Sequence, residues 1–329
     1  MTSLSSGAGR GSSSASGLKT FGLTALRYLL TMVVASVLIF LLMRVVPGDP
    51  AAIALGVTAT PESLAALQAQ LGTDQPLITQ YFSWVSGMLA GNFGTSLSSG
   101  QDTSPIILDR LAVSLILVGS SMVLSLIIAV PVGVIAARRG GALISGLSQI
   151  GIAIPSFLAG IVLISFFSLG LGWVPANGWV PPNEDFGGFL SRLILPVLSL
   201  SAVQGAILTR YVRSAVVDVL SENYMRTARS KGMSQTRALR VHGLRNAALP
   251  VLTVTGLQLT TLLIGAVVIE KVFVIPGIGS MLLESVSNRD LITVQSIVML
   301  LVAFTLLVNL AVDLLYQILD PRISLRAKN

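Results

Sequence analysis

The sequence predicts an all-α, polytopic membrane protein with six transmembrane helices and a helical cap outside the membrane between the first two. Three observations lead to this fold class. Of the 329 residues, 53% are hydrophobic and only 11% are charged, whereas a soluble domain carries roughly 25% charged residues. The mean hydropathy of +0.84 excludes a disordered chain, which needs low hydrophobicity. Six apolar runs are each long enough to cross a bilayer as a helix.

Each span is predicted where apolar residues continue for about 20 positions, because a helix rises about 1.5 Å per residue and the hydrocarbon core is about 30 Å thick. A disordered tail is predicted over 1–25, the first span over 26–46 and an external amphipathic region over 47–110. A core follows over 111–316, with spans at 111–137, 143–171, 193–217, 249–269 and 291–316. A second tail covers 317–329. Pro155 and Pro196 lie inside the third and fourth spans, where neighbouring helices can satisfy the freed backbone groups.

The distribution of basic residues predicts the orientation. Six spans place both termini on the same side of the membrane. Of the 21 lysines and arginines, those on the other side are Arg44, Arg110, Arg192, Lys271 and Arg289. The remainder lie on the side of the termini, so the excess of positive charge predicts that both termini are cytoplasmic. Topology thus explains the net charge of +7, and nucleic acid is not expected as a partner.

The external region, 47–110, contains two predicted helices. Thr60, Pro61 and Glu62 form a helix start, with a capping hydroxyl, a proline in the first position and an acid in the first turn, and Gly72 ends that helix. A second, amphipathic helix covers 77–89 and carries aromatic residues of the kind found at the lipid–water boundary. Two interpretations remain open: a structural cap on the membrane, or a docking surface for an external partner.

The cytoplasmic segment 218–248 is the second long polar stretch. A short helix is expected from Glu222 to Lys231, Gly232 makes a turn, and Ser234 is a suitable cap for a following helix. The apolar strip of the first helix consists of Tyr224, Met225 and Ala228, with basic residues around it. It is either a basic loop held near anionic lipid headgroups, or a helix that docks into a groove of another protein.

Several segments resemble the permeases of binding-protein-dependent ABC importers, in particular the dipeptide, oligopeptide and nickel branch. The resemblance rests first on 222–232, Glu-Asn-Tyr-Met-Arg-Thr-Ala-Arg-Ser-Lys-Gly, and on 242–250, His-Gly-Leu-Arg-Asn-Ala-Ala-Leu-Pro, which are similar to the family's "EAA" loop. Supporting segments are 44–50, 71–76, 92–96, 171–175, 270–279 and 289–290. The resemblance extends over roughly 26–322, nearly all of the chain except its first tail, and its spaced matches are specific for the family rather than for a substrate.

The resemblance implies a type I importer fold and a set of partners. These are a second, different permease subunit, two ABC ATPase subunits that bind ATP and Mg²⁺, an external substrate-binding protein, and the membrane lipid. The family's EAA helix is the coupling helix that sits in a cleft of the ATPase. It implies coupling roles for Glu222, Tyr224, Arg226, Thr227, Ala228, Arg229, Lys231 and Gly232. The family's loop is named after a Glu-Ala-Ala triplet, and this chain departs from it. The three positions hold Arg226, Thr227 and Ala228, so position 226 is not acidic and the nearest acid is Glu222.

We expect alternating access, in which ATP closes the paired ATPases and the coupling helix transmits that motion to the pore. Polar residues that lipid would reject are candidates for the translocation path. They are Gln204, Thr209, Thr255, Gln258, Thr260 and Thr261. Helix–helix hydrogen bonding is the alternative role for each. Asn309 and Asp313 in the sixth span are expected to pair with neighbours, and Glu270 and Lys271 to form an interfacial pair with a gating role left open.

The chain itself is not expected to be an enzyme or to hold a cofactor or metal. It contains no G-x-x-x-x-G-K-[S/T] phosphate loop, no H-E-x-x-H, no cysteine and a single histidine. The function that the resemblance implies is import of di- or oligopeptides in a bacterial inner membrane, driven by ATP hydrolysed on partner subunits. Nickel or glutathione remains an alternative cargo, and an ATP-independent secondary transporter is the alternative class.

Overall fold

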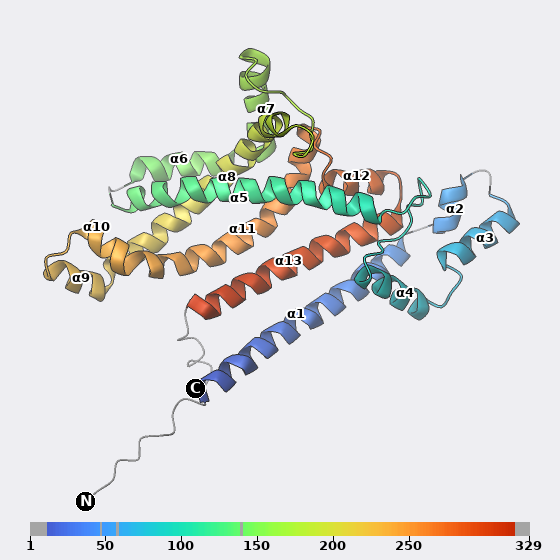
Figure 1. The fold of residues 1–329 in the computed structure, drawn as a ribbon, viewed down its shortest axis with the longest axis horizontal. Helices are drawn as coiled ribbons and strands as arrows, with labels where there is room; N and C mark the ends of the chain where they lie inside the picture. The colour runs from blue at the N-terminus through green and yellow to red at the C-terminus, as the bar shows by residue number, and fades with distance from the viewer. Residues whose placement is uncertain (1–11, 47, 57–58, 139–140, 320–329) are drawn as a thin grey trace, which may run out of the picture.

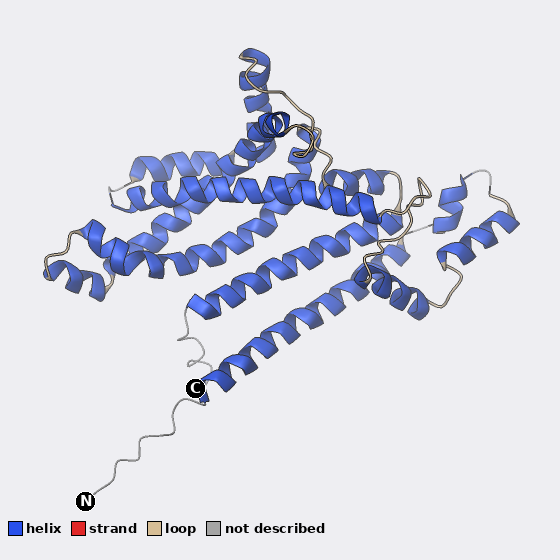
Figure 2. Cartoon of the chain, in the orientation of Figure 1, coloured by secondary structure: helices blue, strands red, loops and turns tan. Residues whose placement is uncertain are grey.

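The computed structural model describes residues 12–46, 48–56, 59–138 and 141–319. All regular elements in these ranges are helices, apart from one isolated bridge between Thr95 and Asp102. Figure 2 shows this helical character throughout. The predicted all-α class is confirmed.

Five helices are long and apolar enough to cross a membrane. They belong to α1 (Ser12–Val45), α5 (Ser104–Arg138), α8 (Phe186–Ser221), α11 (Leu244–Val272) and α13 (Leu291–Leu319). They contain the predicted second, fourth, fifth and sixth spans, and all of the first span except Val46. The helices are longer than the predicted spans, because an apolar run marks only the part of a helix that lies in hydrocarbon.

The third predicted span is broken, so the prediction of one continuous helix over 143–171 is wrong. It consists of α6 (Ala142–Ala153), α7 (Ser156–Leu163) and a π-helix, η2 (Ile164–Gly170). The two halves meet at an angle of 91° at Pro155. Ile154 is extended (φ −87°, ψ 121°), because the proline ring disfavours a helical conformation in the residue before it. The bent pair counts as the sixth span only if it is taken as one crossing.

The predicted disordered tail is also wrong from Ser12 onward, because α1 begins there. Extending an existing helix adds one hydrogen bond per residue without a second nucleation step, so small polar residues can continue a helix whose apolar part is stable. Residues 1–11 and 320–329 lie outside the described residues.

The helices pack around α8, which lies against α5, α6, α7 and α11. Close approach of α5 and α8 depends on Gly133, because a Cβ there would lie 2.7 Å from Val212. The core cluster includes Leu117, Leu208 and Ile269. On the other side α13 packs on α11, and α1 packs on α13, so that α1 is the outermost long helix (Figure 1).

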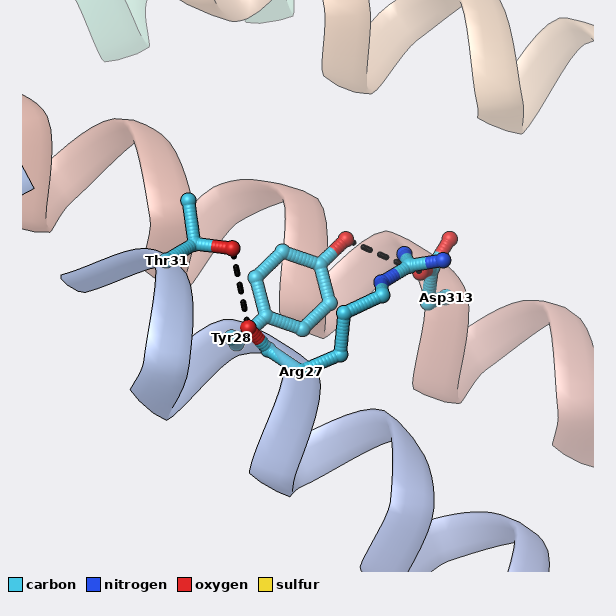
Figure 3. Close-up of polar contacts among 4 residues, drawn as sticks. All are labelled: Arg27, Tyr28, Thr31 and Asp313. Atoms are coloured by element: carbon cyan, nitrogen blue, oxygen red, sulfur yellow. Dashed lines mark hydrogen bonds and ion pairs between the residues drawn. The ribbon is translucent and has the colours of Figure 1, made fainter. Parts of the chain in front are cut away.

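A polar contact joins α1 to α13 (Figure 3). The Arg27 guanidinium lies 3.2 Å from Asp313, and the Tyr28 hydroxyl donates a hydrogen bond of 2.9 Å to the same carboxylate. Thr31 donates to the backbone oxygen of Arg27. The expectation that Asp313 pairs with neighbours is confirmed.

Short helices cover one end of the bundle: α2 (Pro50–Leu55), α3 (Pro61–Leu71), α4 (Leu77–Leu89) and α12 (Ile278–Ser287). The Thr60 hydroxyl accepts from the backbone N–H of Ser63, and Gly72 ends α3 in the left-handed conformation (φ 67°), both as predicted. Asp102 accepts two hydrogen bonds from Ser104 at the start of α5, and these hold the pKa of its carboxyl below the usual value.

Candidate functional site

The segment between α8 and α11 forms a compact hairpin at the end of the molecule opposite to α2, α3 and α4 (Figure 1). It contains α9 (Asn223–Ser230), α10 (Gln235–Ala238) and a π-helical turn, η3 (Leu239–Gly243). Glu222 is extended and separates α8 from α9, and Gly232 turns the chain with a φ of +87°. Ser234 caps α10 by accepting from the N–H of Arg237. These positions agree with the predicted helix, glycine turn and second helix.

The inner face of α9 is buried within this chain. Met225 is fully buried and Ala228 is 7% exposed, in a cluster with Val216, Val219 and Leu239. The prediction that this apolar strip docks into a groove of another protein is therefore wrong for Met225 and Ala228, because α8 and η3 already cover them. Ala228 instead allows α9 to lie close against its own bundle.

The outer face of α9 is basic and exposed. The exposed residues of the hairpin include Glu222, Arg226, Thr227, Arg229, Lys231 and Gly232. Within the described part of the chain, neither Arg226 nor Arg229 forms an ion pair, since the salt bridge found there joins Arg27 and Asp313. Both arginines line a wide, shallow hollow with Gly232 and Ser234. This face carries positive charge that no acid of the described residues pairs with.

Tyr224 links the two halves of the segment. Its hydroxyl accepts a hydrogen bond of 2.9 Å from the side-chain amide of Asn246 in α11. Asn246 belongs to 242–250, the second segment that resembles the family's loop, and the sequence predicts no role for it. Its place in that segment is the signal that could have identified it. Through Met225 and Tyr224, α9 is therefore attached to both α8 and α11.

The six candidates for the translocation path do not share one surface. Gln204 and Thr209 are buried in α8, where Thr209 lies at the close contact with Gly133 of α5. On α11, the hydroxyls of Thr255 and Thr261 donate to backbone oxygens one turn earlier, and Thr261 is exposed.

Two of these polar groups are buried without a partner in the described residues. They are the Gln204 side-chain nitrogen and the Thr260 hydroxyl. Gln258 is half-buried. Helix packing therefore accounts for the burial of the α8 candidates, and among the α11 candidates Thr261 is the exposed one.

Glu270 does not pair with Lys271, so the predicted interfacial pair is wrong. Its side chain is 1% exposed, whereas Lys271 is exposed. The Ser114 hydroxyl donates to Glu270 Oε1 at 2.5 Å, and the backbone N–H of Ser280 donates to Oε2 at 2.8 Å. A Cβ at Gly277 would collide with the carboxyl group. Glu270 thus holds the turn after α11 against α5.

A second buried carboxylate, Asp290, joins two of the other segments that resemble the family, 92–96 and 289–290. It accepts hydrogen bonds from the Ser96 hydroxyl at 2.5 Å and from the Thr293 hydroxyl at 2.8 Å. Ser296 donates to the backbone oxygen of Phe93. The segments 92–96 and 289–290, far apart in the sequence, therefore form one structural unit at the start of α13.

Comparisons with known proteins agree with this architecture. Residues 129–325 match the family "Binding-protein-dependent transport system inner membrane component", and residues 23–118 match the family "Binding-prot-dependent transport system membrane comp, N-term". The "Probable peptide ABC transporter permease protein y4tP" of Sinorhizobium fredii (strain NBRC 101917 / NGR234) is 38% identical over 296 residues, covering 89% of this chain and 95% of that protein. The "Glutathione transport system permease protein GsiC" of Escherichia coli (strain K12) is 40% identical over 300 residues, covering 89% of this chain and 94% of that protein.

A crystal structure of an amino acid ABC transporter with histidines has the same fold. Its TM-score is 0.51 at 16% sequence identity, and the match covers 65% of this chain and 94% of that one. With several apolar helices of membrane-spanning length, the protein is a multi-pass inner-membrane protein. The family matches and the two full-length relatives confirm the resemblance. The chain belongs to the family of binding-protein-dependent transport system inner membrane components, the permease subunits of ABC importers.

Proposed function

We propose that α9 is the coupling helix through which ATPase subunits drive this permease, and that the cargo is a di- or oligopeptide. The observation that carries the proposal is the construction of α9. Its inner face is fixed to α8 and α11, and its outer face presents Arg226 and Arg229, which form no ion pair with any residue that the structure describes. A helix held in this way moves as one body with two long helices. A basic outer face suits a complementary acidic surface on a partner.

The proposed assembly contains this chain, a second permease subunit, two ABC ATPase subunits and an external substrate-binding protein. ATP and Mg²⁺ are held by the ATPases, since this chain has no phosphate-binding loop motif. Both termini and α9 lie on the cytoplasmic side, in agreement with the distribution of lysine and arginine. The end that carries α2, α3, α4 and α12 then faces outward.

The proposed mechanism is alternating access. Closure of the ATPases displaces α9, and the Met225–Ala228 contacts and the Tyr224–Asn246 hydrogen bond carry the displacement into α8 and α11. The equilibrium shifts only by the difference in ATPase binding energy between the two states. Thr255, Gln258, Thr260 and Thr261 of α11 are proposed to line the path, whereas Gln204 and Thr209 of α8 reach it only if the helices separate.

The cargo class rests on the names of the relatives, one a probable peptide permease and one a glutathione permease. Glutathione, itself a small peptide, is therefore the second candidate. Nickel receives less support, since the described residues hold no group of three His, Cys, Asp or Glu side chains suited to a metal ion.

The direct test is uptake by the purified assembly in proteoliposomes. Peptide uptake is expected to require ATP, the binding protein and this chain together. Uptake in the absence of ATP, driven by an ion gradient, would instead support the secondary-transporter class.

Replacement of Gly232 with valine is expected to abolish uptake while leaving membrane insertion intact. Its Cβ would meet no other atom within 4 Å, so the effect comes from the backbone, whose φ of +87° is strained for any residue with a Cβ. Relief of the strain would move the end of α9. Gly100→Val is a matched control, since Gly100 also has a positive φ (+68°) and open space around it. Normal uptake by Gly232→Val would contradict the coupling role.

A further inference from the structure

Helix α4 exposes a row of large apolar side chains at the end of the molecule opposite to α9 (Figure 1). Ile78, Phe82, Val85 and Leu89 recur every three or four residues and therefore lie along one side of the helix, here called the α4 stripe. Ile78 is 63% exposed, Phe82 62% and Leu89 86%. Residues 77–89 include no aspartate, glutamate, lysine or arginine. A helix in water carries charged and polar residues on its outer side, so the α4 stripe does not have the composition of a water-facing surface.

The neighbouring helix α3 is built in the opposite way. Its leucines, Leu64, Leu67 and Leu71, are half-buried, and its exposed residues include Glu62 and Gln70. α3 therefore has the surface of a helix in water, whereas the α4 stripe has the surface of a helix in contact with an apolar phase.

The other two sides of α4 are already in use. Thr79, Gln80 and Ser83 form the polar side of the helix and line a pocket together with residues of α3 and α13. Tyr81 and Trp84 form an aromatic side that packs on α1. The α4 stripe is the remaining side, and the described part of the chain leaves it open.

The contact with α1 fixes the depth of α4. The Tyr81 hydroxyl lies 2.7 Å from the hydroxyl of Ser36. The centre of the Phe40 ring lies 5.5 Å from that of Tyr81 and 6.2 Å from that of Trp84. At about 1.5 Å per residue, Ser36 lies about 14 Å and Phe40 about 8 Å along the helix from Val45, its last residue. Both lie in the part of α1 that is long and apolar enough to cross a membrane. α4 is thus attached beside the membrane-spanning part of α1 and not beyond its end.

The same side of α1 continues as an open apolar surface. Val33 and Val37 lie seven and three residues before Phe40, hence on nearly the same side of the helix, and both are exposed. On a membrane-spanning helix, an exposed apolar surface of this kind meets lipid. Because α4 is attached directly beside this surface, the lipid that covers Val33 and Val37 also reaches the α4 stripe.

We propose that the α4 stripe is buried among lipid acyl chains at the edge of the bilayer, with the polar side of α4 turned to water. A helix that lies in the interface in this way buries its apolar side at the boundary between headgroups and acyl chains. Tyr81 and Trp84 are of the residue types that are enriched at that boundary. The inference requires only that α1 crosses the membrane, so it is independent of the coupling role of α9.

The test measures the surroundings of single nitroxide labels by electron paramagnetic resonance. The chain has no cysteine, so Phe82→Cys and Leu89→Cys each place one label on the α4 stripe. The complete permease–ATPase complex, whose other subunits lack cysteine, is placed in nanodiscs of phosphatidylcholine and phosphatidylglycerol without the binding protein. Oxygen, which concentrates in the bilayer, should relax both labels more strongly than a water-soluble nickel chelate does.

Ser83→Cys is the matched control, because Ser83 directly follows Phe82 and is also exposed, but lies on the polar side of α4. Its label should show the reverse order, with the nickel chelate more effective than oxygen. Val33→Cys on α1 supplies the lipid reference. ATP hydrolysis and thermal melting of each labelled complex report whether it is folded.

Three results would overturn the assignment. If the nickel chelate relaxed the labels at positions 82 and 89 as strongly as the label at 83, the α4 stripe would lie in water. If neither reagent reached positions 82 and 89, protein such as the second permease would cover the stripe. If the nickel chelate reached these labels and the added binding protein then shielded them, the stripe would be a docking surface for that protein. None of these results bears on the proposed function, which fails only if uptake proceeds without ATP or without coupling through α9.

Discussion

Replacement of both Arg226 and Arg229 with glutamate is expected to release the ATPase subunits and stop uptake, while the permease still folds and inserts. Both side chains are exposed on the outer face of α9 and have no ion-pair partner within the described chain. Their reversal therefore leaves the buried contacts of Met225 and Ala228 in place. If the two arginines meet an acidic surface, loss and reversal of those pairs costs roughly 3 kcal/mol or more, a fall of at least about a hundredfold in affinity.

The measurement is co-purification of the ATPases together with ATP-dependent uptake in proteoliposomes. Arg240→Glu combined with Arg245→Glu is the matched control, since these arginines are also exposed and basic but lie in η3 and α11 rather than on α9. The control should retain the ATPases. If both double variants lost the ATPases equally, the effect would be one of general charge, such as attraction to anionic lipid, and a specific role for α9 would be contradicted.

Replacement of Glu270 with alanine is expected to destabilise the permease by roughly 3 kcal/mol, because it leaves the Ser114 hydroxyl and the Ser280 N–H buried without their acceptor. The turn that leads to α12 would also lose its attachment to α5. Glu270→Gln keeps the side-chain volume and one acceptor oxygen, so its effect should be smaller. Thermal unfolding of the purified permease complex measures the change.

Lys271→Ala is the adjacent control. Its side chain is exposed, and surface substitutions of this kind change stability by about 0.5 kcal/mol or less. If Glu270→Ala melted at the same temperature as Lys271→Ala, the hydrogen bonds around Glu270 would not be the link between α11, α12 and α5.

The helical content, the first span and the capped helix at Thr60 could all be predicted, because each depends on a local pattern. The break at Pro155 could not be predicted, because the sequence shows a proline inside the third and the fourth span alike, and only the third span is broken there. Pro196 stays inside α8, which is packed on several sides by other helices, whereas Ile154 before Pro155 is extended. The difference depends on tertiary packing rather than on the proline itself.

The candidate site shows the same limit. The position and basic character of α9 could be predicted from 222–232. What its apolar strip packs against could not, because Met225 and Ala228 are buried by residues of α8 and η3. Glu270 was assigned to its sequence neighbour Lys271. Its real partner, Ser114, is 156 positions away, and no local pattern identifies a contact of that separation.

The most direct test of the coupling role is the accessibility of a single thiol on α9. The chain has no cysteine, so Thr227→Cys places one thiol on the exposed face, to be labelled with a membrane-impermeant maleimide in a complex whose other subunits lack cysteine. The thiol should be unreactive in spheroplasts, reactive in inside-out vesicles stripped of the ATPases, and protected when the ATPases are restored. Labelling from the outside, or equal labelling with and without the ATPases, would contradict the account.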